Sequence, residues 1–338
     1  MKKTIKIKLV GFWRGFEPDE NIIIKCLKKR YNVQIVDDGQ EYILCSVFGE
    51  PYEYCKYKEP RIMYSGENYI PDFNLIDYSI CSYPIEFFDR NFRLPASIYE
   101  TIIRLANKLK NEDTKQSEKI LESKKYFANF IASHESEYNI RGDFFKKLSK
   151  YKRVEACGSY LNNMPNGECV DRKNKIDFQR ETKFTLCFES TKNEGFITEK
   201  IADAFLADTI PVYYGSSDVK KIFNEKAFIN CADYETFDEV IEKIIELDND
   251  DDKYMQMIQE PIFVDENYPN NLIDELEKFL YHIFDPPSES IYRRSRVYAP
   301  EIHNNFLAKV KNIDDISTKA LIKIVIKRII NHLIFLKK

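Results

Sequence analysis

Short apolar runs alternate with amphipathic stretches in the first hundred residues. From Met1 to Val10, lysines alternate with isoleucines and leucine, a period of two that predicts an early strand. The stretch Asp19 to Arg30 places Ile22, Ile23, Cys26 and Leu27 on one side and predicts a helix. Further short runs predict strands at Val33–Val36, Tyr42–Val47, Arg61–Ser65 and Tyr78–Tyr83. Strands that alternate with helices indicate a Rossmann-like domain, which we expect to end near Leu105.

A second unit is predicted from Lys183 to Gly215. An apolar strand, Phe184–Phe188, leads into a polar loop with Gly195, a helix from about Thr198 and another strand, Ile210–Tyr214. This is a βαβ unit, and its loop carries Glu189, Glu199 and Lys200 at a strand's carboxyl end and a helix start. Ligands of open α/β sheets bind at such edges, and helix N-termini favour phosphate. Many such units bind nothing, so these residues alone predict only a candidate phosphate site.

The residues of this stretch also carry a family resemblance. They read F-E-S-T-K-N-E-G-F-I-T-E-K and, further on, I-P-V-Y-Y-G. The pattern resembles that of the α1,3/1,4-fucosyltransferases, glycosyltransferase family 10. Two positions depart from the family pattern: Ser190 stands where Asn is usual, and Phe196 stands where Tyr is usual. A hydrogen bond from that tyrosine hydroxyl to the donor is therefore not expected here.

A second segment strengthens the resemblance. The stretch Y-S-G-E-N-Y-I-P-D-F-N-L-I-D-Y-S-I is similar to the bacterial members of the family, in which the Glu of G-E-N is assigned as the general base. The matching residue is Glu67. From the residues alone, a glutamate beside a glycine after a strand is equally a solvated loop residue. The order of the two segments favours the catalytic role.

Between these segments we expect a linker and the start of a second domain. The lysine- and glutamate-rich stretch Ala106–Lys125 predicts a solvated helix or linker, and Tyr126–Ala132 predicts a strand. A helix is predicted to begin near Asn139. In the resembled family an arginine at its start contacts the donor diphosphate, and Arg141 is the matching residue. The alternative is a surface arginine.

Composition narrows the function classes. The formal net charge of −4 argues against a general nucleic-acid binder, which would be basic. The eight cysteines form no C-x-x-C pair and indicate reduced thiols in a cytosolic protein rather than disulfides. The four histidines are far apart, so we expect no zinc site. The acidic run Asp248–Asp252 contains a D-x-D pattern, but it stands between two helical patterns and favours a solvated helix-capping turn over a metal site.

The C-terminal stretch predicts a basic amphipathic helix from about Ile316. Lys319, Lys323 and Lys327 recur every four residues, and the other side is apolar. Such a helix is too charged to span a bilayer and suits an anionic membrane surface. The alternatives are a subunit interface or packing on the globular body. The N-terminus lacks the apolar region of a signal peptide, and the chain is similar to the cytoplasmic bacterial members rather than to the membrane-anchored animal ones.

The resemblance implies a GT-B fold, in which two Rossmann-like domains face each other across a cleft. We expect an acceptor-side domain at 1–115, a donor-side domain at 116–285 and a basic helical tail at 286–338. The implied activity is inverting transfer of L-fucose from GDP-fucose to a glycan hydroxyl, α1,3 to N-acetylglucosamine in a bacterial surface glycan. The implied location is the inner face of the membrane. No metal or other cofactor is expected.

Each candidate residue receives an expected role. Glu67 is the catalytic base; Arg141 and Lys200 stabilise the diphosphate; Glu199 accepts the ribose hydroxyls. Glu189 orients the fucose or holds the loop, and Phe196 lines the donor site. Two alternatives remain open at this stage: a GT-B transferase that uses another nucleotide sugar, and a non-catalytic, membrane-associated glycan-binding protein.

Overall fold

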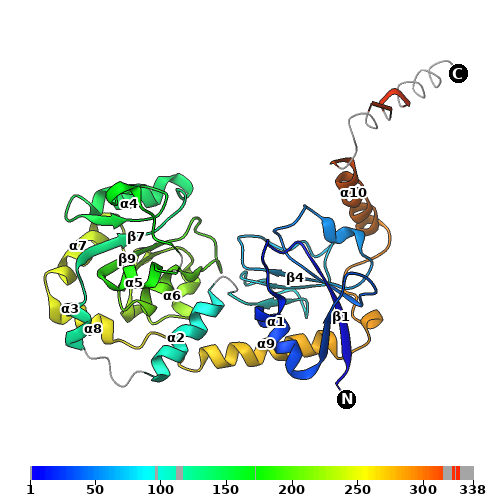
Figure 1. Ribbon diagram of the computed structural model, residues 1–338, viewed down its shortest axis with the longest axis horizontal. Coiled ribbons are helices and arrows are strands. Elements are labelled where there is room, and N and C mark those ends of the chain that lie inside the picture. Colours follow the sequence, from blue (N-terminus) through cyan, green and yellow to red (C-terminus); the bar gives the residue numbers. More distant parts are fainter. Residues whose placement is uncertain are drawn as a thin grey trace.

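The chain folds into two α/β domains that lie next to each other (Figure 1). The computed structural model describes residues 2–95, 98–111, 117–171 and 173–314, together with 322, 323 and 325–327. Both sheets are parallel throughout their described strands, which confirms the predicted Rossmann-like class.

The first sheet has six strands in the order β2-β1-β3-β4-β5-β6. The strand at one edge, β6, was not predicted, because its three residues show no apolar run. The other five overlap their predicted ranges. The bounds are β1 (Thr4–Val10), β2 (Asn32–Ile35), β3 (Tyr42–Cys45), β4 (Arg61–Ser65), β5 (Tyr78–Cys81) and β6 (Asn91–Arg93).

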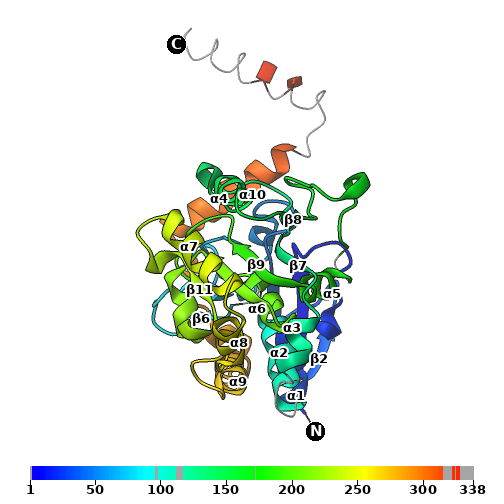
Figure 2. The ribbon, with the colours of Figure 1, turned by 90° about the vertical axis from the view of Figure 1, so that its left-hand side faces the viewer.

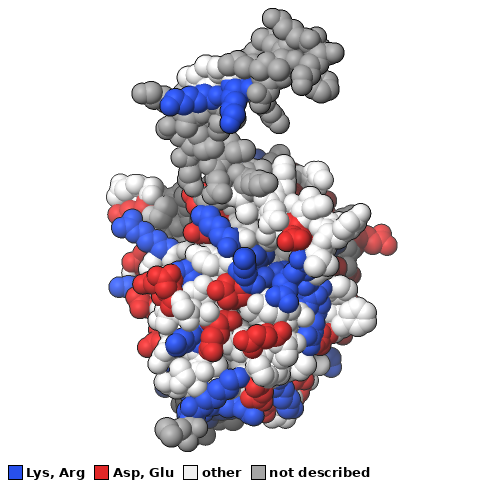
Figure 3. Space-filling view, turned by 90° about the vertical axis from the view of Figure 1, so that its right-hand side faces the viewer, with Lys and Arg blue, Asp and Glu red and all other residues white. Residues whose placement is uncertain are grey.

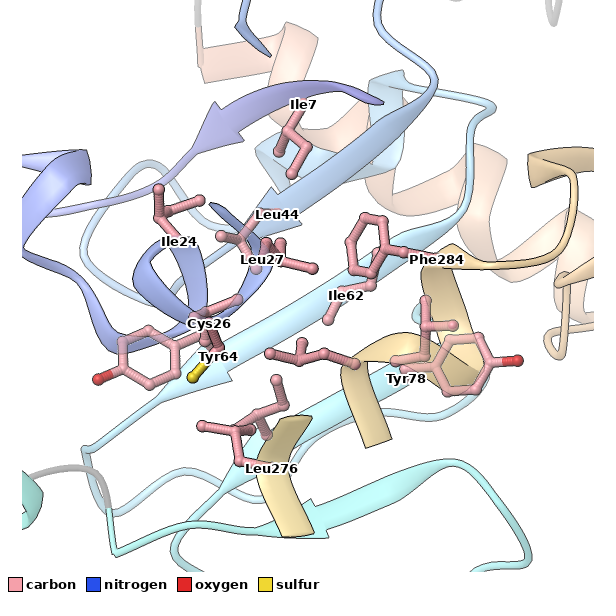
Figure 4. Packing of buried hydrophobic residues seen from close by; sticks show 14 of the residues in the cluster. Ile7, Ile24, Cys26, Leu27, Leu44, Ile62, Tyr64, Tyr78, Leu276 and Phe284 are labelled. Carbon is pink, nitrogen blue, oxygen red and sulfur yellow. The ribbon is translucent and has the colours of Figure 1, made fainter. Parts of the chain in front are cut away.

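Two helices cover one face of this sheet. Helix α1 (Ile22–Arg30) begins where the Asn21 side chain accepts a hydrogen bond from the Ile23 N–H, 3.0 Å away. Helix α9 (Tyr268–Phe284) returns from the second domain and buries Leu276 and Phe284 beside the strands. Figure 4 shows these two side chains gathered with apolar residues of α1, β3 and β4. Burying them removes apolar surface from water, which is the main stabilising contribution.

The opposite face of the first sheet is covered by a helix from later in the chain. Helix α10 (Ala299–Asp314) packs against the 3₁₀ turn η2 (Glu53–Lys56), and Leu307 lies against the apolar cluster beneath. It stands at the outer end of the first domain (Figure 1). The predicted lipid-binding helix lies almost wholly outside the described residues. Of its described residues, Ile322, Val325 and Ile326 are half exposed.

The second sheet has five strands in the order β11-β10-β9-β7-β8. Helices surround it in Figure 2, which brings this domain to the front. Its bounds are β7 (Tyr126–Phe130), β8 (Val154–Ala156), β9 (Thr182–Phe188), β10 (Ile210–Tyr214) and β11 (Ile229–Asn230). The helices are α3 (Ser117–Glu122), α4 (Ile140–Leu148), α5 (Lys175–Arg180), α6 (Glu199–Leu206), α7 (Phe237–Asp248) and α8 (Asp251–Gln259).

The stretch predicted as a solvated linker is instead partly packed. Helix α2 (Tyr99–Asn111) overlaps the start of this stretch and lies against α6, where Ala106 and Leu109 pack against the core of the second domain. Lys108 of α2 also pairs with Asp208 at 2.6 Å. The many lysines made the stretch look solvated, but its apolar residues lie on one side of the helix. The chain thus crosses between the domains near α2 and returns with α9.

A buried ion pair attaches the segment before α10 to the first sheet. Arg294, which is 7% exposed, pairs with Asp77, a fully buried residue directly before β5. The same carboxylate accepts the backbone N–H groups of Arg293 and Arg294 at 2.8 and 2.9 Å. Arg293 itself pairs with Asp89 at 2.7 Å. These arginines therefore belong to the globular body.

Candidate active site

The loop after β4 carries the predicted base. Strand β4 is buried along its whole length and ends at Ser65, whose hydroxyl accepts the Glu67 N–H at 3.2 Å. The Glu67 carbonyl accepts the Tyr69 N–H at 2.8 Å, which tightens the turn. The Glu67 side chain is exposed to solvent beyond the strand's end. An exposed carboxylate at this edge is accessible to an incoming hydroxyl.

Glu189 closes the loop between β9 and α6. Its carboxylate is fully buried, and a buried carboxylate requires partners. One oxygen, Oε1, accepts the Thr198 N–H at 2.7 Å, and the other, Oε2, accepts the Thr198 hydroxyl at 2.8 Å and Lys200 Nζ at 3.1 Å. Lys200 Nζ also donates to Thr198 Oγ1 at 2.7 Å. The buried anion thus holds the lysine at the first turn of α6, where the helix N-terminus adds positive potential.

Glu199 is restrained by a lysine that the sequence did not single out. Lys175 of α5 lies 3.7 Å from the Glu199 carboxylate and 2.7 Å from that of Asp203. Burial alone would lower the pKa of Lys175, but Asp203 and Glu199 outweigh it and raise the pKa above its ordinary value. The lysine therefore stays charged and holds Glu199 beside the N-terminus of α6.

Arg141 is a buried residue in the first turn of α4, not a surface arginine. It is 5% exposed, and its guanidinium donates to the Phe188 carbonyl at 2.8 and 3.1 Å and to the His134 carbonyl at 2.9 Å. Burial lowers its pKa, and the Glu189 and Glu135 carboxylates offset part of that effect. The three bonds fix the guanidinium at the carboxyl end of β9.

The two predicted loops meet through one amide. Asn68, next to the predicted base, donates from Nδ2 to Thr191 Oγ1 at 3.1 Å and accepts from Asn193 Nδ2 at 2.9 Å. Its Oδ1 also accepts the hydroxyl of Tyr83. The structure therefore brings Glu67 of the first domain next to the Glu189–Lys200 loop of the second. The sequence predicted both loops but gave no role to Asn68.

A glycine allows this close approach. Gly195 has φ +83°, and a Cβ there would lie 2.6 Å from the Ser82 carbonyl oxygen of the first domain. Its N–H donates to Ser216 Oγ at 2.8 Å. Phe196 follows it and is 6% exposed, so the residue that replaces the family's tyrosine packs inward. A second contact, Arg93 with Asp218 at 2.7 Å, closes the same side of the interface.

The acidic run Asp248–Asp252 makes structural contacts with the neighbouring helices. Asp250 caps α8 by accepting the Lys253 N–H at 3.0 Å, as the sequence predicted. Asp248 is 9% exposed rather than solvated, because it accepts the Tyr151 hydroxyl and pairs with Lys152. Among the described residues, no group of three or more His, Cys, Asp or Glu side chains is arranged to hold a metal ion. The eight cysteines are free thiols, and seven are buried.

Two parallel α/β sheets whose carboxyl edges meet define a GT-B type of glycosyltransferase fold. A solved structure described as an α1,3-fucosyltransferase has a TM-score of 0.73 to this chain and is 27% identical; the match covers 88% of this chain and 93% of that one. Another, of an α1,3-fucosyltransferase with GDP-fucose, has a TM-score of 0.67, 28% identity and coverage of 83% and 91%.

The family follows from the sequence comparisons. Residues 121–259 match the family described as glycosyltransferase family 10 (fucosyltransferase), C-terminal part, and residues 7–99 match the α-(1,3)-fucosyltransferase FucT N-terminal domain. The α-(1,3)-fucosyltransferase FucT of Helicobacter pylori is 31% identical over 298 residues, 76% of this chain. The chain belongs to glycosyltransferase family 10, of the bacterial FucT type, which confirms the predicted resemblance.

More distant relatives match a shorter part of the chain. The human 4-galactosyl-N-acetylglucosaminide 3-α-L-fucosyltransferase 9 is 29% identical over 135 residues, 39% of this chain and 36% of its own length. The chain spans 60% of the length of the Helicobacter relative. No described helix is both long and apolar enough to cross a membrane.

Proposed function

We propose that this protein transfers L-fucose from GDP-fucose to a hydroxyl of a glycan acceptor, with inversion. The observation that carries the proposal is the contact of Asn68 with Thr191 and Asn193, which brings the predicted base loop and the predicted donor loop together. The solved relative with GDP-fucose supports the choice of donor.

The reaction is an in-line displacement at the anomeric carbon. The acceptor oxygen forms the new bond to that carbon while the bond to the β-phosphate oxygen breaks. Glu67 takes the acceptor proton as the oxygen attacks, which requires an accessible carboxylate at this edge. GDP leaves with increased negative charge, and Lys200 and Arg141 supply fixed positive charge where it develops.

The neighbouring residues position these groups. Glu199, restrained by Lys175, accepts the ribose hydroxyls. Glu189, with its carboxylate bonded to Thr198 and Lys200, holds the loop and aims the lysine. Phe196 packs beside this loop and offers the donor an apolar contact without a hydroxyl.

Replacing the base tests this proposal directly. Glu67→Gln keeps the size of the side chain but cannot take a proton, so kcat should fall about 10²–10⁴-fold while GDP-fucose affinity stays close to wild type. Glu86→Gln, an exposed glutamate of the same domain, is the control and should behave as wild type. A folded Glu67→Gln variant with normal turnover would show that Glu67 is not the base. Transfer from another nucleotide sugar in preference to GDP-fucose would show that GDP-fucose is not the donor.

The acceptor we propose is N-acetylglucosamine in a bacterial surface glycan such as lipopolysaccharide or a glycoprotein, fucosylated at its 3-hydroxyl. The names of the Helicobacter and human relatives support an α1,3 linkage. A screen of glycan acceptors with GDP-fucose, followed by NMR of the product, measures the linkage. A product linked α1,4 would correct this part of the proposal.

We further propose that the reaction needs no divalent metal. The fixed cations Arg141 and Lys200 can balance the leaving diphosphate, and Asp248 and Asp250 are occupied in structural contacts. Transfer should therefore persist in excess EDTA. Loss of transfer that manganese restores would show that a metal takes part.

The tail is proposed to bind an anionic membrane surface, at the inner face of the membrane. Lys323 and Lys327 follow the four-residue spacing of the basic side, and Ile322 and Val325 expose apolar surface. On the face of the first domain shown in Figure 3, acidic and basic residues are interspersed. Attraction to anionic lipid would therefore depend on the tail rather than on that face.

A further inference from the structure

Four aromatic side chains form an exposed cluster on the first domain. Phe12, Trp13 and Phe16 lie in the loop after β1, and Phe48 lies in the loop after β3. Trp13 packs edge-on against both Phe16 and Phe48, with ring centroids 4.8 and 5.3 Å away. Trp13 is 42% exposed and Phe48 is 46% exposed. We call this cluster the aromatic ledge.

Backbone contacts hold the ledge in place. The Phe48 and Gly49 N–H groups both donate to the Gly11 carbonyl, at 2.8 and 3.1 Å, so the two loops are tied together. A Cβ on Gly49 would lie 2.4 Å from the Gly11 Cα, so only glycine permits this approach. The Phe16 N–H donates to the Trp13 carbonyl at 3.1 Å. Exposed aromatic surface that is fixed in this way indicates a binding site rather than scattered surface residues.

The ledge lies at the same sheet edge as the predicted base. Strands β1, β3 and β4 are neighbours, and Cys45 pairs with Met63, so Phe48 and Gly66 both lie three residues beyond a paired position. Neighbouring strands are about 4.8 Å apart. The strands that lead into the loops of Phe48 and Trp13 are therefore one and two strand spacings, roughly 5 and 10 Å, from the strand that leads to Glu67. The loop after β1 lies on the side of the first domain that faces the second (Figure 1).

The chemistry of the ledge fits a sugar ring. One face of a pyranose consists of C–H groups with partial positive charge, and an aromatic face is negative. We propose that Trp13 and Phe48 stack against a sugar ring of the acceptor, next to the ring whose hydroxyl Glu67 deprotonates. This inference rests on the proposed function and adds that the acceptor is at least a disaccharide.

Trp13 is the one tryptophan of the sequence, so its fluorescence reports the ledge directly. We expect β-galactosyl-1,4-N-acetylglucosamine to change the tryptophan emission of the full-length protein, and free N-acetylglucosamine to change it far less at equal concentration. GDP-fucose alone should leave the emission nearly unchanged. Equal responses to both sugars, or no response to the disaccharide, would overturn the proposal.

Steady-state kinetics provide a second test of the aromatic ledge. Trp13→Ala and Phe48→Ala should each raise the KM for the disaccharide about tenfold, with the KM for GDP-fucose unchanged. Trp13→Phe should recover most of the affinity, because it retains an aromatic face. Phe88→Ala is the matched control: Phe88 is 94% exposed in the same domain but precedes β6, at the opposite sheet edge. Circular dichroism confirms folding of each variant.

The outcomes separate the two proposals. If the wild type consumes no GDP-fucose with any acceptor or with water, the proposed function fails. If the wild type transfers fucose but the ledge variants keep a normal acceptor KM, the ledge inference alone is wrong. Self-association that depends on protein concentration and is abolished by Trp13→Ala, with acceptor KM unchanged, would make the ledge a contact between copies of the chain.

Discussion

The Nδ2 atom of Asn68 lies 3.1 Å from Oγ1 of Thr191, although 123 residues separate them. The bond joins the loop that carries Glu67 to the loop between β9 and α6. It crosses between the domains at a point where Asn193 and Tyr83 also contact the same amide. Asn68 therefore helps to fix the relative position of the proposed base and donor loops, together with the Arg93–Asp218 contact.

Removing that side chain should separate catalysis from donor binding. Asn68→Ala loses the bonds to Thr191 and Asn193, each worth about 0.5–1.5 kcal/mol. We expect kcat to fall about tenfold or more, because base and donor are no longer held in register, with GDP affinity close to wild type. Steady-state kinetics and calorimetric titration with GDP measure the two quantities.

Asn74→Ala is the control for this variant, because the Asn74 amide bonds to Asp72 within its own loop. It should leave kcat unchanged. Asn68→Asp keeps an acceptor for Asn193 and loses the donor to Thr191. Its kcat should therefore lie between those of Asn68→Ala and Asn74→Ala. Normal kcat in Asn68→Ala would mean that the contact does not set the catalytic geometry.

Loss of Lys200 or of Arg141 should weaken GDP binding and also destabilise the fold. Each is expected to contribute about 1.5–3 kcal/mol to GDP binding through a charge-assisted contact. Lys200→Ala should lose this affinity and also stability, because the fully buried Glu189 carboxylate loses its cation. Arg141→Ala should lose affinity and also stability, because the Phe188 and His134 carbonyls lose their donor.

Lys192→Ala supplies the control for donor binding. Lys192 is exposed on the same loop, and its ammonium lies over the Tyr214 ring. GDP affinity should not change in this variant. Wild-type GDP affinity in both Lys200→Ala and Arg141→Ala would reject the diphosphate assignment.

The buried pair of Arg294 and Asp77 should dominate the stability of the C-terminal attachment. Arg294→Ala leaves a fully buried carboxylate without its cation, which costs about 3–5 kcal/mol. Urea unfolding measures this free energy. Arg293→Ala, which removes a partner of the half-exposed Asp89, should cost no more than about 1 kcal/mol.

The Arg293 variant also has a defined pH dependence. In the wild type the hydrogen bond from Arg293, with a smaller contribution from His282, lowers the pKa of Asp89 to about 2, from an unfolded value of about 3.9. A depressed carboxyl pKa stabilises the folded state above the unfolded value. The difference in unfolding free energy between wild type and Arg293→Ala should therefore be full above about pH 4 and disappear as the pH falls toward 2. A constant difference down to pH 2 would contradict this assignment.

The tail prediction concerns vesicle binding. Full-length protein should sediment with vesicles of phosphatidylserine and phosphatidylcholine at low salt, and not with phosphatidylcholine alone. Reversing the charge of Lys319, Lys323 and Lys327 should abolish this binding, since each basic residue contributes about 1 kcal/mol near such a surface. Reversing Lys146, Lys150 and Lys226, exposed lysines of the second domain, is the control. Equal loss in both variants would show that net charge, not the tail, is responsible.

The sequence predicted the local elements of the site well. The strand, loop and helix around Glu189 and Lys200 appeared where the period of apolar residues placed them, because that period reflects burial along one segment. It could not predict the partners of Asn68, since an amide can bond equally well to water or to a distant loop. The packing of α2 on the second domain was missed for a related reason: an apolar helix face does not specify which core it enters.

The burial of charged side chains was the second feature that the sequence did not predict. Hydropathy places Arg61, Asp77 and Arg294 at the surface, yet they are 2%, 0% and 7% exposed. The Arg294 guanidinium donates to Asp77, and the Arg61 guanidinium donates to the Tyr57, Leu75 and Cys55 carbonyls and to Asn304. These partners are brought together only by folding, and Asp77 with Arg294 and Arg61 with Asn304 lie 217 and 243 residues apart. Arg141 was treated as a diphosphate ligand from its family match, whereas its three bonds to carbonyls became visible only in the folded structure.

The attachment of Arg294 to Asp77 has a mechanical consequence. The segment leading to α10 is fastened to the first sheet, and α10 packs on η2 of the same domain. A force applied to the tail would therefore reach the body that carries Glu67 first. If the tail binds a membrane as proposed, the first domain is the part held at the surface, and the second domain is held there through its links to the first, which include α2, α9 and the Asn68–Thr191 bond.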